Sequence, residues 1–173
     1  DATAPANGLS SVQNLTTTPV TNQDFGYAPA GQATGEGLIG DTIFADRDLG
    51  NDYDPGEGLE GVVVQLYSDT NGDGNYDAGE PLLNATVTDE NGKYSFGNLP
   101  PGNYVVKVDT ATLPGVLTNS VDPGGIGPLN ESGVTLAAGE INLNQDFGYI
   151  GQTGLPGTIG NLIWNDVNAN GVV

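Results

Sequence analysis

The sequence predicts an all-β fold made of tandem antiparallel Greek-key β-sandwich modules, one complete and two partial. Two observations favour this class over a helical one. The 173 residues include 28 Gly and 11 Pro, and no stretch repeats its apolar residues with the period of a helix. Instead, short β-branched and aromatic runs are separated by Gly, Asn and Asp turns, and about seven such strands per module are typical of two sheets that cover each other's apolar faces.

In the complete module, the strands are predicted from short apolar runs of the sequence. The expected strands are residues 39–45, 62–67, 85–88, 93–96, 104–108, 134–136 and 141–149. Asn91-Gly92 is a strong hairpin signal, so the third and fourth runs are predicted to pair with each other. The fifth run alternates, which predicts that its even-numbered side chains point into the core and that Val105 and Lys107 point outward. Residues 110–133 are rich in Gly and Pro and are expected to form a long surface connection without a strand.

An internal repeat sets the domain organisation. The segment 22–27 (NQDFGY) recurs letter for letter at 144–149, and each copy is followed by a similar segment, 38–46 and 158–166. The same order of both segments indicates a repeat of one whole domain. The predicted parts are the C-terminal strands of a preceding repeat (1–27), a linker (28–38), a complete repeat (39–149), a second linker (150–158), and the first strand and start of the acidic loop of the next repeat (159–173).

The charge balance excludes several classes of protein. With 22 acidic and 3 basic side chains, the net charge of −19 argues against nucleic acid as a partner, because phosphates need Lys and Arg, and it favours cations. No apolar run is long enough to cross a bilayer, so no direct membrane insertion is expected. The chain lacks Cys and His, which removes the commonest nucleophiles and bases and predicts that it is not an enzyme. Without disulfides, bound metal ions are an alternative way to staple a small core.

The strongest local motif is the twelve-residue loop 69–80, DTNGDGNYDAGE. It fits the calcium-loop pattern D-x-[DN]-x-[DN]-G-x5-E, in which alternate oxygen-bearing side chains surround a hard cation. Its flanks resemble strands and not helices, so we expect a structural Ca²⁺ site between two strands. The candidate ligands are Asp69, Asn71, Asp73, Asn75, Asp77 and Glu80. The alternative is a turn without metal, since Asn, Asp and Gly favour turns in any case.

Two further acidic segments resemble this loop. Residues 46–57 also run from Asp to Glu, but Gly50 and Asn51 stand at positions 5 and 6, where the pattern has an acid or amide and then Gly. The candidate ligands here are Asp46, Asp48, Asp52, Asp54 and Glu57. Residues 166–173 match positions 1, 3, 5 and 6 through Asp166, Asn168, Asn170 and Gly171. The competing interpretation of all this acidity is a solvated surface of the kind that keeps halophilic proteins soluble.

The order of these motifs resembles one known family. The chain carries an Ile-Gly-Asp strand at 39–41, the acidic loop, and then the segments GEGLEGVVVQLY (56–67), TDENGKYSF (88–96), LPPGNY (99–104) and DFGY (146–149). This arrangement looks like the SdrD B-like repeat, a calcium-binding β-sandwich module of bacterial surface adhesins that is related in fold to Cna B-type domains. The resemblance implies an extracellular rod of modules stiffened by calcium, with ligands in both complete acidic loops.

Cna B-type relatives often carry a Lys-to-Asn isopeptide bond, and the resemblance raises that question here. The lysines of this chain are Lys93 and Lys107, and neither lies on the predicted first strand, so no such bond is predicted. Asn14, Asn84 and Asn130 begin N-x-[ST] triplets, but in an Asn-rich β-protein these are expected by chance more often than as glycan sites.

The function favoured by the sequence is therefore a rigid stalk or spacer in an adhesin-like array on the cell surface, with neighbouring repeats of the same chain as its partners. One alternative is a self-assembling subunit of an extracellular filament or surface layer, whose partners are other copies of the chain. A remote alternative is a carbohydrate-binding module, but aromatic residues that alternate with polar ones indicate core packing. The residues predicted to pack in the core in this way are Phe25, Tyr27, Phe44, Tyr94, Phe96, Tyr104, Phe147, Tyr149 and Trp164.

Overall fold

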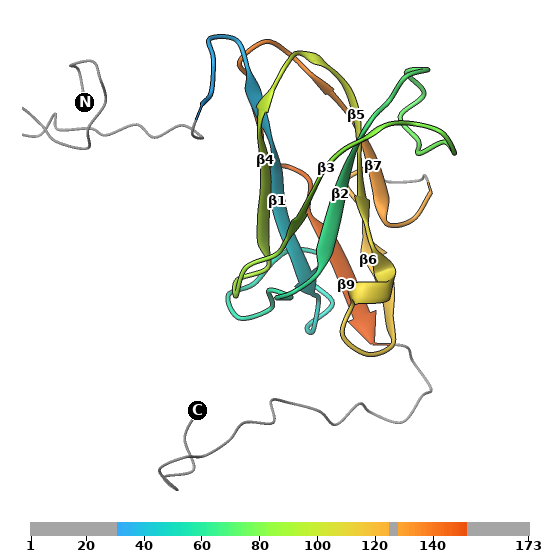
Figure 1. Ribbon diagram of the computed structural model, residues 1–173. Coiled ribbons are helices and arrows are strands. Elements are labelled where there is room, and N and C mark those ends of the chain that lie inside the picture. The colour runs from blue at the N-terminus through green and yellow to red at the C-terminus, as the bar shows by residue number, and fades with distance from the viewer. Residues whose placement is uncertain (1–30, 125–127, 152–173) are drawn as a thin grey trace, which may run out of the picture.

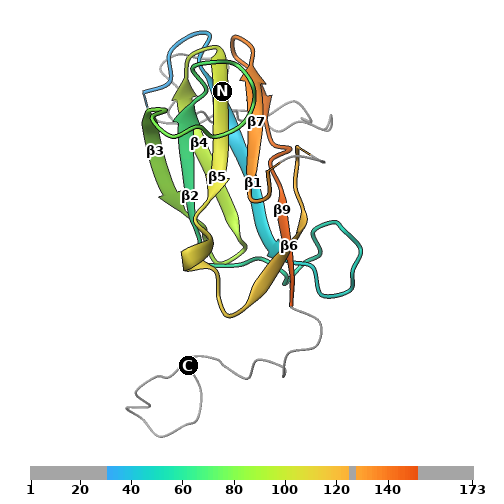
Figure 2. The same cartoon turned by 90° about the vertical axis from the view of Figure 1, so that its right-hand side faces the viewer.

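The computed structural model describes residues 31–124 and 128–151, which form two β-sheets packed face to face (Figure 1, Figure 2). The strands are β1 (Gly37–Ala45), β2 (Val63–Ser68), β3 (Leu82–Val87), β4 (Lys93–Leu99), β5 (Gly102–Val108), β6 (Leu117–Val121), β7 (Glu131–Leu136), β8 (Ile141–Asn142) and β9 (Phe147–Gly151). The helical content of these described residues is one 3-10 turn, Thr110–Thr112. The all-β sandwich prediction is confirmed, with nine strands in the described part of the chain where about seven were expected.

The two sheets differ in how their strands run. One has the order β4-β1-β9-β6, with the short β8 also paired to β1, and the other has the order β3-β2-β5-β7. Strand β1 pairs in parallel with both β8 and β9, for example Ile43 with Phe147, so the prediction of a purely antiparallel fold was wrong in this sheet. The reason is that β7 belongs to the opposite sheet, and the chain crosses over before β9 enters beside β1.

The predicted hairpin across Asn91-Gly92 is also wrong. The turn itself forms, since Gly92 N donates to Asp89 O at 2.9 Å and Asp89 N donates to Lys93 O at 3.0 Å. However, β3 pairs with β2 and β4 pairs with β1. The turn therefore connects strands of two different sheets, and these two strands do not pair with each other. Gly92 O accepts a hydrogen bond from Ile43 N at 2.8 Å, which draws the start of β4 toward β1.

The segment 110–133, which was expected to lack strands, contains β6 and the beginning of β7. Strand β6 pairs antiparallel with β9 at the edge of its sheet. Its side chains are half-buried or exposed, so its sequence LTNSV carries only a weak apolar alternation.

No helix in the described residues is long and apolar enough to span a membrane.

The core fills the space between the two sheets. It contains the predicted aromatic side chains Tyr94, Phe96, Tyr104, Phe147 and Tyr149 together with a set of aliphatic residues: Ile39, Ile43, Leu59, Val62, Val64, Leu66, Leu99, Val106, Val108, Val134 and Leu136. The prediction that these aromatic residues pack in the core is confirmed, so these five rings do not form a carbohydrate platform. Phe25, Tyr27 and Trp164 lie outside the described residues, as do the predicted partial repeats.

The outward-facing side of β5 is not all exposed. Val105 points away from the core, as its alternation predicts, yet it is fully buried. The strand register places it between Tyr67 of β2 and Gly133 of β7, on the face of the sheet opposite the core. That outer face is covered, and the covering segment is the acidic loop that follows β2.

Candidate metal centres

The two acidic loops follow two of the sandwich's central strands. Loop A (residues 46–57) follows β1, and loop B (residues 69–80) follows β2. The loops lie at opposite ends of the sandwich, as both views show (Figure 1, Figure 2). They are therefore two separate candidate sites, each built within one loop.

The first and last carboxylates of each loop are buried at its base. Asp46 and Glu57 are 3% and 5% exposed, and Asp69 and Glu80 are each 8% exposed. Both glutamates accept two backbone hydrogen bonds from matching positions. Glu57 accepts from Arg47 N (2.8 Å) and Asp54 N (3.2 Å), and Glu80 accepts from Thr70 N (2.9 Å) and Asp77 N (3.2 Å). The glutamate at position 12 thus closes the loop on itself in the same way at both sites.

The backbone conformations of the two loops also correspond. Positions 4 and 6 are left-handed in both, at Leu49 (φ 65°) and Asn51 (φ 63°) in loop A and at Gly72 (φ 75°) and Gly74 (φ 77°) in loop B. Loop A reaches this geometry without glycine, which costs roughly 1–2 kcal/mol per L-residue, less for Asn. The departure of loop A from the sequence pattern therefore does not change its path.

The aspartates at position 1 show the one clear difference. Asp69 accepts from Gly72 N at 2.6 Å and from Gly74 N at 2.9 Å, one bond to each carboxylate oxygen. Asp46 accepts from Asn51 N at 3.3 Å through Oδ2, while its Oδ1 is buried without a hydrogen-bond partner. A buried, unpaired carboxylate oxygen is costly, and a cation is the partner that suits it. Loop A therefore fits a bound cation at this atom.

The interior of loop B holds its remaining acids close together. Asn71 Nδ2 donates to Asp77 Oδ2 at 2.7 Å and to Asp73 Oδ2 at 3.1 Å. Asn75 lies beside them. Its backbone N donates to Asp73 Oδ1 at 2.9 Å, and its side-chain Nδ2 donates to Asp73 O at 3.1 Å. The Asn71 amide thus lies between two carboxylates and partly compensates for their charge.

The acidic side chains of loop A lie close enough to influence one another. Asp48 raises the pKa of Asp54 above its usual value, with smaller contributions from burial, Asp52 and Glu57. The only basic residue of the loop, Arg47, is solvent-exposed. Within residues 31–124 and 128–151, no three carboxylates already converge as metal ligands do. Asp166, Asn168 and Asn170 lie outside the described residues.

Sequence reasoning missed the residues that hold loop B against the sheet. Gly74 lies against Gly133 so closely that a Cβ on Gly133 would fall 2.4 Å from Gly74 Cα. Glu131 of β7 accepts a hydrogen bond from Tyr76 N at 2.9 Å, and the ring of Tyr76 lies 4.5 Å from that of Tyr67. The only signal in the sequence was the tyrosine at position 8 of both loops.

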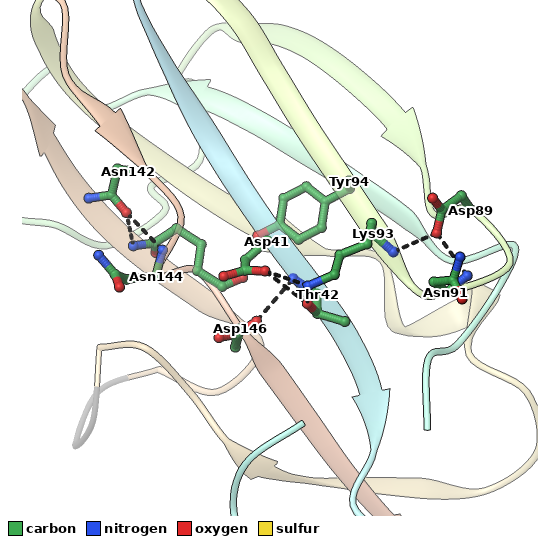
Figure 3. A network of polar contacts seen from close by, with 10 residues as sticks. Asp41, Thr42, Asp89, Asn91, Lys93, Tyr94, Asn142, Asn144 and Asp146 are labelled. Carbon is green, nitrogen blue, oxygen red and sulfur yellow. Dashed lines mark hydrogen bonds and ion pairs between the residues drawn. The ribbon is translucent and has the colours of Figure 1, made fainter. Parts of the chain in front are cut away.

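A polar network around Lys93 connects β1, β4 and the segment before β9 (Figure 3). Lys93 Nζ donates to Asp41 Oδ1 at 2.9 Å and to Thr42 Oγ1 at 2.5 Å, and Thr42 N donates to Asp146 Oδ1 at 3.0 Å. Burial, followed by Asp41, raises the pKa of Asp146, while its hydrogen bonds with Thr42 and the charge of Lys93 oppose that shift. Lys93 therefore serves as a counter-charge for this network.

Two of the three N-x-[ST] asparagines can be placed. Asn84 lies exposed on β3, where its Oδ1 accepts a hydrogen bond from Ala85 N at 2.8 Å. Asn130 Oδ1 accepts from Tyr149 OH at 2.9 Å, so this side chain is already engaged in the fold. Asn14 lies outside the described residues.

A two-sheet sandwich with a calcium-type acidic loop at each end defines a class of small structural β-modules. The family model of the SdrD B-like domain matches residues 37–149, and the chain belongs to that family. The resemblance drawn from the motifs is therefore confirmed. It also agrees with the expectation of a structural domain.

Several proteins are similar to this chain over most of its length. Serine-aspartate repeat-containing protein D of Staphylococcus aureus (strain Newman) is 30% identical over 171 residues, which is 96% of this chain and 12% of the relative. Colossin-B of Dictyostelium discoideum is 26% identical over 152 residues, covering 78% of this chain and 4% of that protein. The chain thus spans only a small part of the curated relatives it matches.

Among solved structures, the Bacillus anthracis TIE protein gives a TM-score of 0.45 at 16% identity, covering 67% of this chain and 17% of that one. The streptococcal ancillary pilin gives 0.43 at 18% identity, covering 68% of this chain and 33% of the pilin.

Proposed function

We propose that this chain is a calcium-stabilised structural module of an extracellular cell-surface protein and acts as a stiff spacer between neighbouring repeats. The observation that carries the proposal is the shared geometry of loops A and B, which have buried carboxylates at both ends and the same left-handed turns. Two different sequences that keep one backbone path point to one shared task. The unpaired oxygen of Asp46 supports a cation as the ligand.

The donor sets consist of the oxygen atoms that calcium prefers. In loop B they are Asp69, Asn71, Asp73, Asp77 and Glu80, with the backbone at Asn75, and in loop A they are Asp46, Asp48, Asp52, Asp54 and Glu57. Asn71 now donates from Nδ2 to two carboxylates, so it must rotate its amide to present Oδ1 to a cation. Calcium, when bound, supplies the positive charge that relieves the repulsion among these carboxylates.

The stabilisation expected from each site is modest. Extracellular calcium modules commonly have Kd values of about 10⁻⁴ to 10⁻³ M. At about 1 mM calcium, preferential binding to the folded state then adds about 0.4 to 1.4 kcal/mol per site. Membership of the SdrD B-like family and the net charge of −19 both support a location where millimolar calcium is present. Two such clamps at opposite ends favour a spacer role.

Calorimetric calcium titration of the full chain tests this proposal. Asp73→Ala combined with Glu80→Ala is expected to remove the binding event of loop B, and Asp48→Ala combined with Glu57→Ala is the matched change in loop A. Circular dichroism checks that each variant keeps its strands. Unchanged stoichiometry in both double variants would show that these side chains are not ligands.

A second candidate function is lateral self-assembly, and the observation that favours it is the edge strand β3. Within the part of the chain that the structure describes, this strand ends its sheet and pairs with β2. Leu82, Leu83 and Val87 are 53%, 49% and 57% exposed, and the strand carries no charge, although the chain has a net charge of −19. An uncharged edge is the place where another acidic copy can add its own β3 in antiparallel pairing.

Sedimentation velocity tests this second candidate. The wild-type chain is expected to form dimers at high concentration, and Ala85→Lys on β3 is expected to keep it monomeric. Thr118→Lys, on the exposed edge strand β6 of the other sheet, is the control. Equal association of all three proteins, or none in the wild type, contradicts assembly through β3.

A further inference from the structure

The two loops carry a tyrosine at the same place. Tyr53 and Tyr76 both stand at position 8, and both are half-buried, whereas positions 9 to 11 after them are exposed. The ring of Tyr53 meets Phe44 edge-on with centroids 6.1 Å apart, and the ring of Tyr76 lies 4.5 Å from that of Tyr67. In each loop, the tyrosine side chain therefore packs against the strand that precedes the loop.

The two lysines of the chain lie over these two rings. Lys93 Nζ is 5.0 Å from the ring centroid of Tyr53, and Lys107 Nζ is 4.7 Å from that of Tyr76. Each lysine is also anchored to its own sheet by an ion pair, Lys93 with Asp41 at 2.9 Å and Lys107 with the buried Glu131. The chain thus places its two lysines at equivalent contacts on opposite sheets.

We infer that Tyr53 and Tyr76 are positioning residues, which Lys93 and Lys107 hold in place so that each loop is pre-formed for its cation. This inference rests on the proposed calcium function and goes beyond it by assigning a role to side chains that are not ligands. We call the contact between the tyrosine ring and the lysine the tether of each loop. In loop B the backbone adds a second contact to the sheet, because Tyr76 N donates to Glu131 Oε1, and Glu131 also pairs with Lys107.

The physical reason is the cost of ordering. A loop that is free before binding must lose backbone freedom at many residues when calcium binds, and that loss weakens the apparent affinity. Aromatic and cation–π contacts of this kind shift an equilibrium by about three- to thirty-fold. The lysine charge itself opposes a nearby cation, so a lysine substitution alone has two effects of opposite sign. A tyrosine substitution changes no charge and isolates the tether.

Calcium titration of the full chain provides the first test. In a Glu57→Gln background, where loop B is the remaining complete loop, Tyr76→Leu is expected to weaken calcium binding by about three- to thirty-fold, whereas Tyr76→Phe keeps the ring and the affinity. In a Glu80→Gln background, Tyr53→Leu is expected to do the same to loop A. Tyr53→Leu should leave loop B unchanged.

Hydrogen exchange in EDTA provides the second test, which needs no calcium. Amides of residues 69–80 are expected to exchange faster in Tyr76→Leu and in Lys107→Met than in the wild type, and Lys107→Arg is expected to restore protection. If the wild type binds no calcium, the proposed function fails while exchange still reports on the tether. Unchanged exchange and unchanged affinity in the Tyr→Leu variants overturn the inference.

Discussion

The packing of loop B against β7 leads to a sharp prediction for Gly133→Ala. A Cβ at this position would lie 2.4 Å from Gly74 Cα and 2.6 Å from Gly74 O. Carbon atoms in contact are about 3.5 Å apart, so loop B must move away by about 1 Å. Both neighbours are backbone atoms and cannot rotate aside. Overpacking of this kind costs about 1–3 kcal/mol, even though Ala in place of Gly otherwise favours a strand.

The assay is thermal unfolding with and without calcium. Gly133→Ala is expected to lower Tm by about 4 °C or more and to weaken calcium binding at loop B, while loop A keeps its affinity. Gly102→Ala on the neighbouring strand β5 is the control, because its Cβ would meet nothing closer than 3.7 Å. A Gly133→Ala protein as stable as the wild type, with normal affinity at loop B, refutes the packing of this loop on the sheet.

Two further predictions concern calcium and pH. EDTA is expected to lower Tm and to raise protease sensitivity, and a Tm that does not change on full chelation contradicts the role of metal in stability. Burial raises the pKa of Asp122 to about 6 from its usual 3.8, so its contribution to stability is full below pH 3.8 and is lost as pH rises through about 6. Asp122→Asn is therefore expected to melt above the wild type at pH 7 and together with it below pH 4, and a constant difference across this range in melting curves contradicts the shift.

The sequence predicts a strand best where one face is buried and the other is solvated. Residues 93–96 and 104–108 alternate clearly, and both lie in strands of the sandwich. Strand β6 was missed because it is an edge strand with few apolar residues. The partners of β3 and β4 were also missed, because a turn signal at Asn91-Gly92 specifies a change of direction but not the sheet that each strand joins.

The candidate sites show the same division between local and long-range information. The carboxylates at positions 1 and 12 could be chosen as candidate ligands because their spacing is local, and all four are buried in the structure. The contacts of Tyr76 with Lys107 and Glu131 were not identifiable, because they join residues far apart in the chain. The same holds for Val105, whose outward face is buried only because loop B folds back over the sheet.

The differences between the loops predict that removal of calcium affects them unequally. Loop A holds Leu49 and Asn51 in left-handed conformations, leaves Asp46 Oδ1 unpaired and crowds Asp54 against Asp48. Loop B has glycine at the same two left-handed positions, and both carboxylate oxygens of Asp69 accept backbone hydrogen bonds. Because loop A carries more backbone strain and a buried carboxylate oxygen without a partner, chelation of calcium is expected to loosen it first. Hydrogen exchange at low calcium measures this order, and earlier opening of residues 69–80 than of residues 46–57 would contradict it.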